Sequence, residues 1–513
     1  MSQRFRGWVV RALVLCAALV LPTLWAQDAG ARVGGGHTYS GSSRSSGSSR
    51  SSGSSRSYSS SRSYGGSSSG GTSDPLGSLV FLVILFVIIW FVVKSRQGTN
   101  PLFRPGMTGA QLMAQFAGGN LAALAAHAGR PRHAADAVAA LDPTFSEPVF
   151  LEWVTLLYTR AQQGRGKDRS ALAPWFANVD EALPAVMGGV PVKDVRGVVV
   201  GSIKLGGLQQ CPQGLRLGVT IQACVTVNHG SREQAYYVHE RWTLMRALGV
   251  TSRAPDDVEK MGCPTCGSAV ERTAQGRCAS CGNELTPGKR DWGVEKVEVL
   301  EMETRPPLLE GSVEEVGTDL PTVFSPTLAG EMAALKLDPT FDAQRFQTRA
   351  RTIFMTLQEG WTSQQWEKLR PYETENVFQQ HRFWMEEYKK KGLRNVLANV
   401  RLTRVEVVNV QKDAHYQAIT CRMHAAMRDS TVRVSTGKVV GGDAGRDRVF
   451  TEYWTFLRRP GAQTKGQDAN CPSCGAPLKV SQAGVCEYCN SKITRGQFDW
   501  VLSRIEQDEE YTG

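Results

Sequence analysis

The sequence predicts an α+β protein built from two copies of one unit, preceded by a single membrane-spanning helix. Three observations predict this plan. Residues 76–93 form an uncharged apolar run, four short motifs occur twice in the same order, and the hydrophobic period changes from helical to alternating within a copy. The chain has 513 residues, which exceeds the size of one ordinary domain and agrees with this division.

Residues 1–26 have the order of a secretory signal peptide. Arginines come first, an apolar run follows, and Trp25-Ala26 supplies the small residue of a cleavage site. Cleavage near Ala26, an uncleaved anchor and lipidation at Cys16 stay open. Residues 27–75 are rich in Gly, Ser and Arg with few aliphatic side chains, so we expect a disordered segment outside the cytoplasmic membrane.

The apolar run Leu76–Val93 predicts a transmembrane helix. At 1.5 Å per residue it just spans a hydrocarbon core. Lys94 and Arg96 follow at once, and such positive flanks favour the cytoplasmic side. We therefore expect a single-pass protein of a bacterial-type inner membrane with its C-terminal domains in the cytoplasm. Residues 94–140 are expected to be a linker with a helical segment.

An internal repeat organises the rest of the chain. The second occurrence of each motif follows the first by about 200 residues, and the motifs keep their order. Residues 141–300 and 337–513 are therefore predicted to be two copies of one unit, joined by a linker at 301–336. Apart from the cysteine motif, the repeated motifs are Leu141-Asp-Pro-Thr-Phe145 with Leu337-Asp-Pro-Thr-Phe341, Glu240–Arg246 with Glu452–Arg458, and Asp291-Trp292 with Asp499-Trp500.

Each copy is predicted to contain helices followed by a strongly bent antiparallel sheet. In the second copy Asp342 caps a helix up to Trp361, and Pro371 ends a short helix. The expected second-copy elements are helices at 342–361, 363–369 and 374–391 and strands at 402–410, 415–428 and 449–457, with turns at 412–413 and 441–445. The first copy fits less regularly, with a helix at 150–162 and strands at 197–204, 215–227 and 236–246.

Both copies carry the cysteine pattern C-P-x-C-G, ten further residues, and C-x-x-C. Two residues between cysteines let a tight turn direct both thiolates at one tetrahedral metal ion. The spacing predicts two structural Zn²⁺ ions, held by Cys263, Cys266, Cys278 and Cys281 at 263–281 and by Cys471, Cys474, Cys486 and Cys489 at 471–489. Disulfides, which would need an oxidising compartment, and an iron or redox role are the alternatives.

The charge distribution argues against a nucleic-acid partner. Formal net charge is +11, but the first 96 residues carry +8 of it and the remaining 417 residues only +3. Since four thiolates contribute about −2 at each zinc ion, the metallated C-terminal part is close to neutral.

The position of the cysteines predicts a zinc ribbon at the tip of a hairpin. In each copy they lie between the last two strands, which suggests a rigid projecting finger suited to a partner. The repeated tryptophans beside them are expected to pack beneath the ribbon; these are Trp242, Trp292, Trp454 and Trp500. The unmatched Cys211, Cys224 and Cys421 are expected to be ordinary reduced residues.

In the second copy a family resemblance is carried by Leu337–Asp342, Phe354–Trp361, Leu369–Tyr372 and the strand at Val405–Val408. On these residues the resemblance is to the Tim44-like family, named for a scaffold of the mitochondrial import motor. It implies two cones like nuclear transport factor 2, with helices on a curved sheet around an apolar pocket. It also implies contacts with membranes, lipids or proteins without catalysis. The zinc ribbons depart from the family pattern and suggest an added contact surface.

We therefore expect a non-enzymatic, membrane-tethered scaffold or adaptor that binds a protein partner at the cytoplasmic face. Binding of lipid or a membrane surface, through the pocket or the Lys389–Lys391 run, is the alternative. A pocket enzyme is a remote alternative. The candidate catalytic residues are His239, His381 and His415. None of them has a second ionisable residue at a sequence spacing typical of a catalytic pair.

Overall fold

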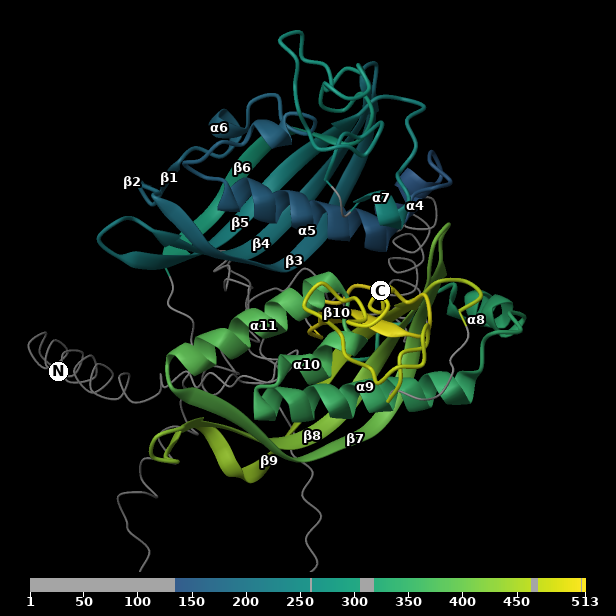
Figure 1. Ribbon diagram of the computed structural model, residues 1–513. Helices are drawn as coiled ribbons and strands as arrows, with labels where there is room; N and C mark the ends of the chain where they lie inside the picture. Colours follow the sequence, from purple (N-terminus) through teal and green to yellow (C-terminus); the bar gives the residue numbers. More distant parts are fainter. Residues whose placement is uncertain (1–133, 259–260, 305–317, 463–468, 509) are drawn as a thin grey trace, which may run out of the picture. The chain divides into compact units, whose positions relative to one another are not determined.

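The computed structural model describes residues 134–258, 261–304, 318–462, 469–508 and 510–513. They form a mixed α+β structure with two curved four-stranded antiparallel sheets, each accompanied by helices (Figure 1). The α+β prediction is confirmed. The predicted signal peptide, Gly/Ser-rich segment and transmembrane helix lie outside the described residues. Among the residues that the structure describes, no helix is long and apolar enough to cross a membrane.

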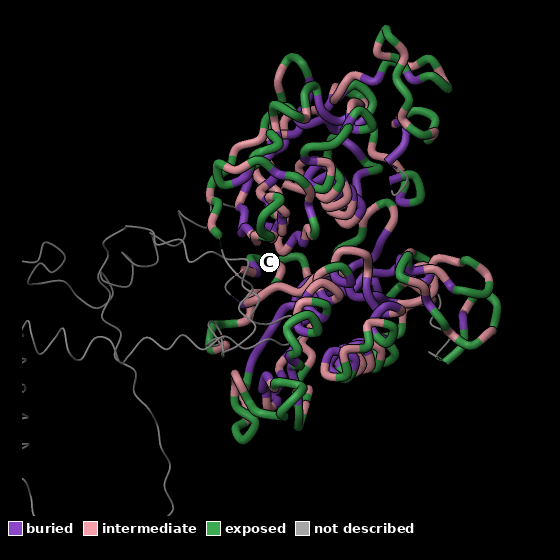
Figure 2. Tube along the Cα trace, turned by 60° about the vertical axis from the view of Figure 1, so that its left-hand side comes forward, coloured by how far each residue is buried: buried purple, intermediate pink, exposed green. Residues whose placement is uncertain are grey.

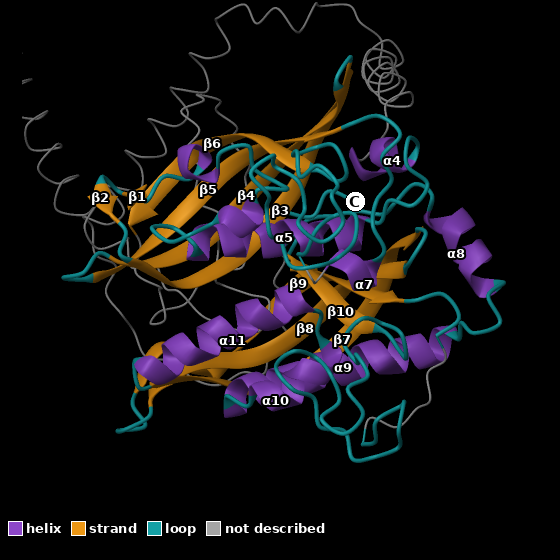
Figure 3. Ribbon diagram, turned by 45° about the horizontal axis from the view of Figure 1, so that its top comes forward, coloured by secondary structure: helices purple, strands orange, loops and turns teal. Residues whose placement is uncertain are grey.

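In the first unit most helices precede the four-stranded sheet, and one short helix, Pro255–Val258, lies between its last two strands (Figure 3). Its strands are hydrogen-bonded in the order β3-β4-β5-β6, so the sheet is a simple meander. The helical elements are α4 (Ala134–Ala139), α5 (Glu147–Gln163), the 3₁₀ turn η2 (Ser170–Leu172), α6 (Val179–Ala182) and α7 (Pro255–Val258). The strands are β1 (Val186–Met187), β2 (Val190–Pro191), β3 (Asp194–Cys211), β4 (Gly214–Asn228), β5 (Glu233–Arg246) and β6 (Gly293–Thr304).

The second unit repeats this arrangement with longer helices. Its sheet has the order β10-β9-β8-β7, the same meander. The helical elements are α8 (Leu328–Lys336), α9 (Ala343–Ser363), α10 (Trp366–Leu369), the 3₁₀ turn η3 (Arg370–Tyr372) and α11 (Glu375–Lys390). The strands are β7 (Leu393–Lys412), β8 (Gln417–Arg433), β9 (Val439–Arg458) and β10 (Val501–Glu506). Asp342 caps α9 as predicted, its side chain accepting a hydrogen bond from the backbone N–H of Arg345.

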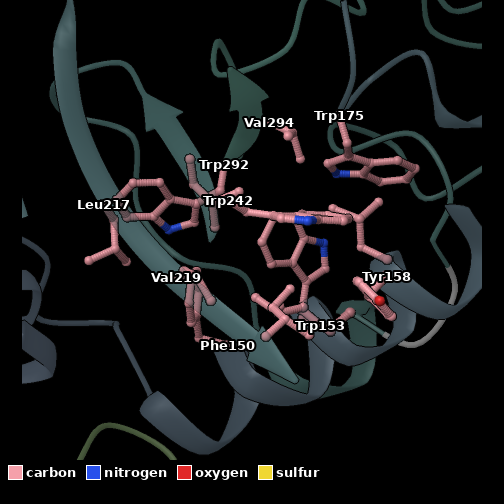
Figure 4. Packing of buried hydrophobic residues seen from close by; sticks show 14 of the residues in the cluster. Phe150, Trp153, Tyr158, Trp175, Leu217, Val219, Trp242, Trp292 and Val294 are labelled. Atoms are coloured by element: carbon pink, nitrogen blue, oxygen red, sulfur yellow. The ribbon is translucent and has the colours of Figure 1, made fainter. Parts of the chain in front are cut away.

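Each core lies between the helices and one face of the sheet. From Leu215 onward burial alternates along β4, as expected for a strand with one face against a core. In the first unit Trp153 and Tyr158 of α5 pack onto Trp242 and Leu217 of the sheet (Figure 4). In the second unit Phe346 and Trp361 of α9 belong to the corresponding cluster. Buried residues follow the strands and the inner sides of the helices (Figure 2).

The predicted turn at 441–445 is wrong. Strands β8 and β9 continue past it, with Gly441 opposite Thr431 and Asp443 opposite Asp429, and the hairpin turns at 434–438 instead. The glycine-rich stretch accommodates an irregularity in the pairing of β8 with β9. Gly442 has φ +70°, and a Cβ there would lie 2.3 Å from the carbonyl oxygen of Asp429. The predicted turn after Lys412 does join β7 to β8.

Candidate metal centres

The structure brings the eight predicted cysteines together in two groups of four. Within each group the sulfur atoms all lie within 4.8 Å of one another. We call residues 263–281 the first ribbon and residues 471–489 the second ribbon. The first ribbon lies between β5 and β6, and the second lies between β9 and β10. In both cases the two flanking strands are hydrogen-bonded to each other. The predicted position between the last two strands is therefore confirmed.

The distances between sulfur atoms fit a tetrahedral metal ion. The closest described pairs are 3.8 Å and 3.9 Å apart in the first ribbon and 3.8 Å and 4.0 Å apart in the second. Four zinc–thiolate bonds of about 2.3 Å would hold sulfurs about 3.8 Å apart. A disulfide would need about 2.05 Å, and all eight cysteines are free. Each group could therefore hold one metal ion with no cysteine moved.

Tight turns build both halves of each group. In the first half the amide of Gly267 donates to the carbonyl of Cys263, and Gly475 repeats this bond with Cys471. These glycines have φ near +75°, a conformation that other residues adopt rarely. The second half uses the same left-handed conformation at the residue after its last cysteine. That residue is Gly282 in the first ribbon and Asn490 in the second. The amino acid therefore differs between the ribbons, while both residues keep the left-handed backbone conformation.

The surroundings of the sulfurs favour thiolate at some positions and oppose it at others. A hydrogen bond from the amide of Asn283 lowers the pKa of Cys281 to about 6, and one from Ser491 lowers the pKa of Cys489 to about 6. Burial instead raises the pKa of Cys263 to about 11. A bound divalent cation would hold all four as thiolates and release protons on binding.

Three of the repeated motifs meet at the base of each ribbon. In the first unit Arg246 donates to the carboxylate of Asp142 at 2.8 Å, and its guanidinium lies 4.5 Å from the ring centre of Trp292. In the second unit Arg458 lies 3.2 Å from Asp338 and 4.9 Å from the ring of Trp500. The repeat therefore encodes one cluster that joins the segment before the first long helix, the end of the strand before the ribbon and the residue that precedes the strand after it.

The cluster holds its carboxylates ionised. Burial would raise the pKa of Asp142, but hydrogen bonds from Thr144 and Ser252 keep it below its ordinary value. Hydrogen bonds from Thr340 and Gln417 lower the pKa of Asp338 to about 2 although burial opposes them. Both carboxylates therefore stay charged beside their arginines at neutral pH.

The tryptophans pack as predicted. Trp242, Trp292, Trp454 and Trp500 are all at most 2% exposed. Within the sheets, Trp242 donates its indole N–H to Glu240, and Trp454 donates to Glu452, each at 2.9 Å. Burial raises the pKa of Glu240. Each of these two buried carboxylates thus accepts a hydrogen bond from the tryptophan two residues further along the same strand.

The second ribbon does not project freely, which corrects the prediction of a finger at this site. Arg370, the first residue of η3, is fully buried and donates to the carbonyl of Gln482 in the ribbon at 2.9 Å. The same guanidinium bonds to Glu375 and lies over the ring of Phe378. A side chain at Gly484 would come within 2.5 Å of it. The ribbon is therefore fastened to the helices of its own unit.

The first ribbon has no such fastening among its described hydrogen bonds, which all end within residues 261–290. Gly276 stands where Gly484 stands in the second ribbon. A side chain at Gly276 would meet Arg272, which belongs to the first ribbon itself. Among the described residues, the hydrogen bond between a ribbon and the helices is thus specific to the second unit, whereas the first ribbon packs on the core of its unit through Val270.

The three candidate histidines do not come together. His239 lies opposite Glu301 on the sheet, and His415 lies in the turn after β7. His381, however, has a partner that sequence reasoning missed: its Nδ1 lies 2.5 Å from Oε1 of the fully buried Glu373. The eight-residue separation is no recognisable motif, because Glu373 precedes α11 and pairs with β10. The pair packs against Trp361.

The fold and the cysteine groups define an α+β protein with two four-sulfur ribbons. Residues 329–467 match the family model of the Tim44-like domain. The match runs from α8 through β9 and ends before the second ribbon. No curated protein matches the sequence.

Proposed function

We propose that this protein is a non-enzymatic scaffold, tethered to the cytoplasmic face of a bacterial-type inner membrane, that binds a protein partner. The match of residues 329–467 to the Tim44-like domain carries the proposal, since that domain suggests a scaffold or adaptor role. The tether is the apolar run at 76–93. The likeness between the units further supports two duplicated cones of the nuclear transport factor 2 type, at 141–300 and 337–513.

The proposal assigns one structural zinc ion to each ribbon. Four thiolates at tetrahedral spacing are the donor set of structural zinc sites, and no coordination position would remain for water or substrate. In these sites the metal would stabilise the ribbon. We assign the contact surface to the first ribbon, because Arg370 fastens the second ribbon to its own unit.

Site-specific photocrosslinking of the full chain in its native membrane tests this function. A photoreactive residue replaces exposed Ala279 in the first ribbon, and the matched control replaces exposed Glu487, its equivalent in the second. We expect a discrete protein adduct at Ala279 that disappears in the Cys278→Ser variant and is absent at Glu487. Adducts to lipid alone would refute the scaffold in favour of the lipid alternative, and no adduct at either position would refute partner binding by the ribbons.

A further inference from the structure

The first sheet ends in a long strand whose outer edge pairs with no other strand of the described residues. Strand β6 is the last in the order β3-β4-β5-β6 and pairs with β5 from Gly293 to Thr304 (Figure 3). On its other side the structure describes one bridge, between Val294 and Phe176 at the start of the strand. Beyond Val294, the backbone N–H and C=O groups that point away from β5 can therefore pair with one further strand.

The equivalent strand of the second unit offers a much shorter edge. Strand β10 has six residues and ends at Glu506, whereas β6 has twelve. Two residues after Glu506, the buried Asp508 accepts a hydrogen bond from Thr451 of β9 and forms an ion pair of 2.7 Å with Arg422 of β8. These contacts turn the chain away from the edge and back over its own sheet.

A difference in sequence between the units accounts for the longer edge. Leu300 stands at the position of Asp508, nine residues after the aspartate of the repeated Asp-Trp motif in each unit. Thr220 stands at the position of Arg422 on the neighbouring strands. The ion pair that turns the chain in the second unit therefore cannot form in the first, and β6 continues along β5 to Thr304.

The core face of β6 is apolar and partly uncovered. Directly opposite residues of an antiparallel pair share a face of the sheet. Val299 and Met302 lie opposite the buried Glu240 and Val238, so they lie on the core face, yet they are 56% and 39% exposed. Among the described residues, the helices of the first unit therefore leave this part of the core face open.

The other face of β6 is acidic. Glu298 and Glu301 lie opposite Arg241 and His239, on the side of the sheet away from the core. Over its whole length β6 carries four glutamates and one lysine. Like charges directly opposite each other destabilise a sheet, and opposite charges stabilise it. The edge therefore disfavours a second copy of β6 and favours a strand with basic side chains on this face.

We propose that an extended segment of the protein partner adds to the first sheet along β6, with alternating apolar and basic side chains. Its backbone pairs with the open edge, its apolar side chains cover Val299 and Met302, and its lysine or arginine side chains lie beside Glu298 and Glu301. The inference rests on the proposed scaffold function. It places this contact on the strand that follows the first ribbon in the chain.

Fluorescence anisotropy with synthetic peptides tests this inference on the purified full chain. The probe is a peptide of about six alternating lysine and valine residues, and a glutamate–valine peptide of the same length is the comparison. Since the chain has a formal net charge of +11, nonspecific attraction would favour the acidic peptide. We expect tighter binding of the basic peptide, and loss of that binding when its backbone amides are methylated, because methylation removes the donors of a strand ladder.

Two charge-reversal variants locate the binding site. Glu301→Lys should weaken binding of the basic peptide about fivefold, because it turns an attraction between neighbouring strands into a repulsion. Glu367→Lys is the matched control, since it makes the same charge change at an exposed residue of α10 in the second unit. Binding that Glu301→Lys weakens and Glu367→Lys leaves unchanged supports the proposal.

Equal or tighter binding of the acidic peptide overturns the proposal, and so does binding that survives methylation of the backbone or falls equally in both variants. Failure to bind either peptide overturns it as well, and self-association of the chain in that case would assign the edge to a second copy. Because the peptides are tested without the partner, these outcomes are independent of the crosslinking test of the scaffold function.

Discussion

Replacing Arg246 by Gln should loosen the base of the first ribbon more than any comparable surface change. Arg246 and Asp142 are each 1% exposed, and removing one member of such a pair typically costs 3–5 kcal/mol. Asp142 keeps hydrogen bonds from Thr144 and Ser252 in the variant, which places the cost near the low end. We expect a loss of about 3 kcal/mol in local stability, including the contact with Trp292.

Hydrogen–deuterium exchange of the full chain is the suitable assay, because a single unfolding free energy is poorly defined for a chain with two units. A loss of about 3 kcal/mol should speed exchange of peptides from β6 and from residues 140–146 by about 100-fold. Peptides from β7 and β8 should not change.

Arg216→Gln is the matched control for this variant. Arg216 lies on β4 beside β5 and forms a bidentate ion pair with Glu295 of β6. Both side chains are about one-third exposed. Such pairs contribute about 0–1 kcal/mol, so exchange should change only a few-fold. If Arg246→Gln accelerates exchange no more than Arg216→Gln does, the buried cluster does not hold the ribbon in place and our reasoning is wrong.

Three further predictions address the metal, the second ribbon and acid stability. The full chain should contain two zinc ions by atomic emission; Cys278→Ser should retain one and Cys224→Ser both, and no zinc in the wild type would exclude the assignment. Arg370→Gln should make peptides of the second ribbon exchange at least tenfold faster, whereas Lys368→Gln, which removes an exposed ion pair, should not. Asp338 has a folded pKa of about 2, below its unfolded value near 3.9, so its contribution is full above about pH 4 and fades toward pH 2. Resistance to pepsin should therefore differ between wild type and Asp338→Asn at pH 4, and the difference should shrink by pH 2; a constant difference would contradict this.

Local patterns sufficed for the elements whose residues interact with near neighbours in sequence. The helical period from Phe346 to Trp361 and the cap at Asp342 locate α9 closely. The C-x-x-C spacing locates each half of a metal centre, because two residues determine the turn. Glycine was less informative: the run at 441–445 looks like a turn, and only the pairing with β8 shows that it accommodates an irregular strand.

Contacts between distant residues could not be derived from these patterns. Asp142 and Arg246 were both recognised as repeated, yet 104 residues separate them, and nothing in the sequence says that they touch. The same holds for Arg370 and Gln482, which are 112 residues apart. The predicted finger fails at the second ribbon for this reason, since one buried arginine on a short helix decides whether the ribbon is held.

The two ribbons therefore have the same metal geometry and different surroundings, and this difference bears on function. If the ribbons served only to close the last two strands, the cluster of aspartate, arginine and tryptophan at each base would be enough in both units. The second ribbon gains Arg370 in addition, whereas the described hydrogen bonds of the first ribbon all end within residues 261–290. A hydrogen bond from a fully buried arginine stabilises the ribbon that accepts it, and the first ribbon lacks this stabilisation among its described hydrogen bonds. A ribbon that no helix of its own unit holds by a hydrogen bond keeps its surface available to another protein, which is why we propose partner binding at the first ribbon.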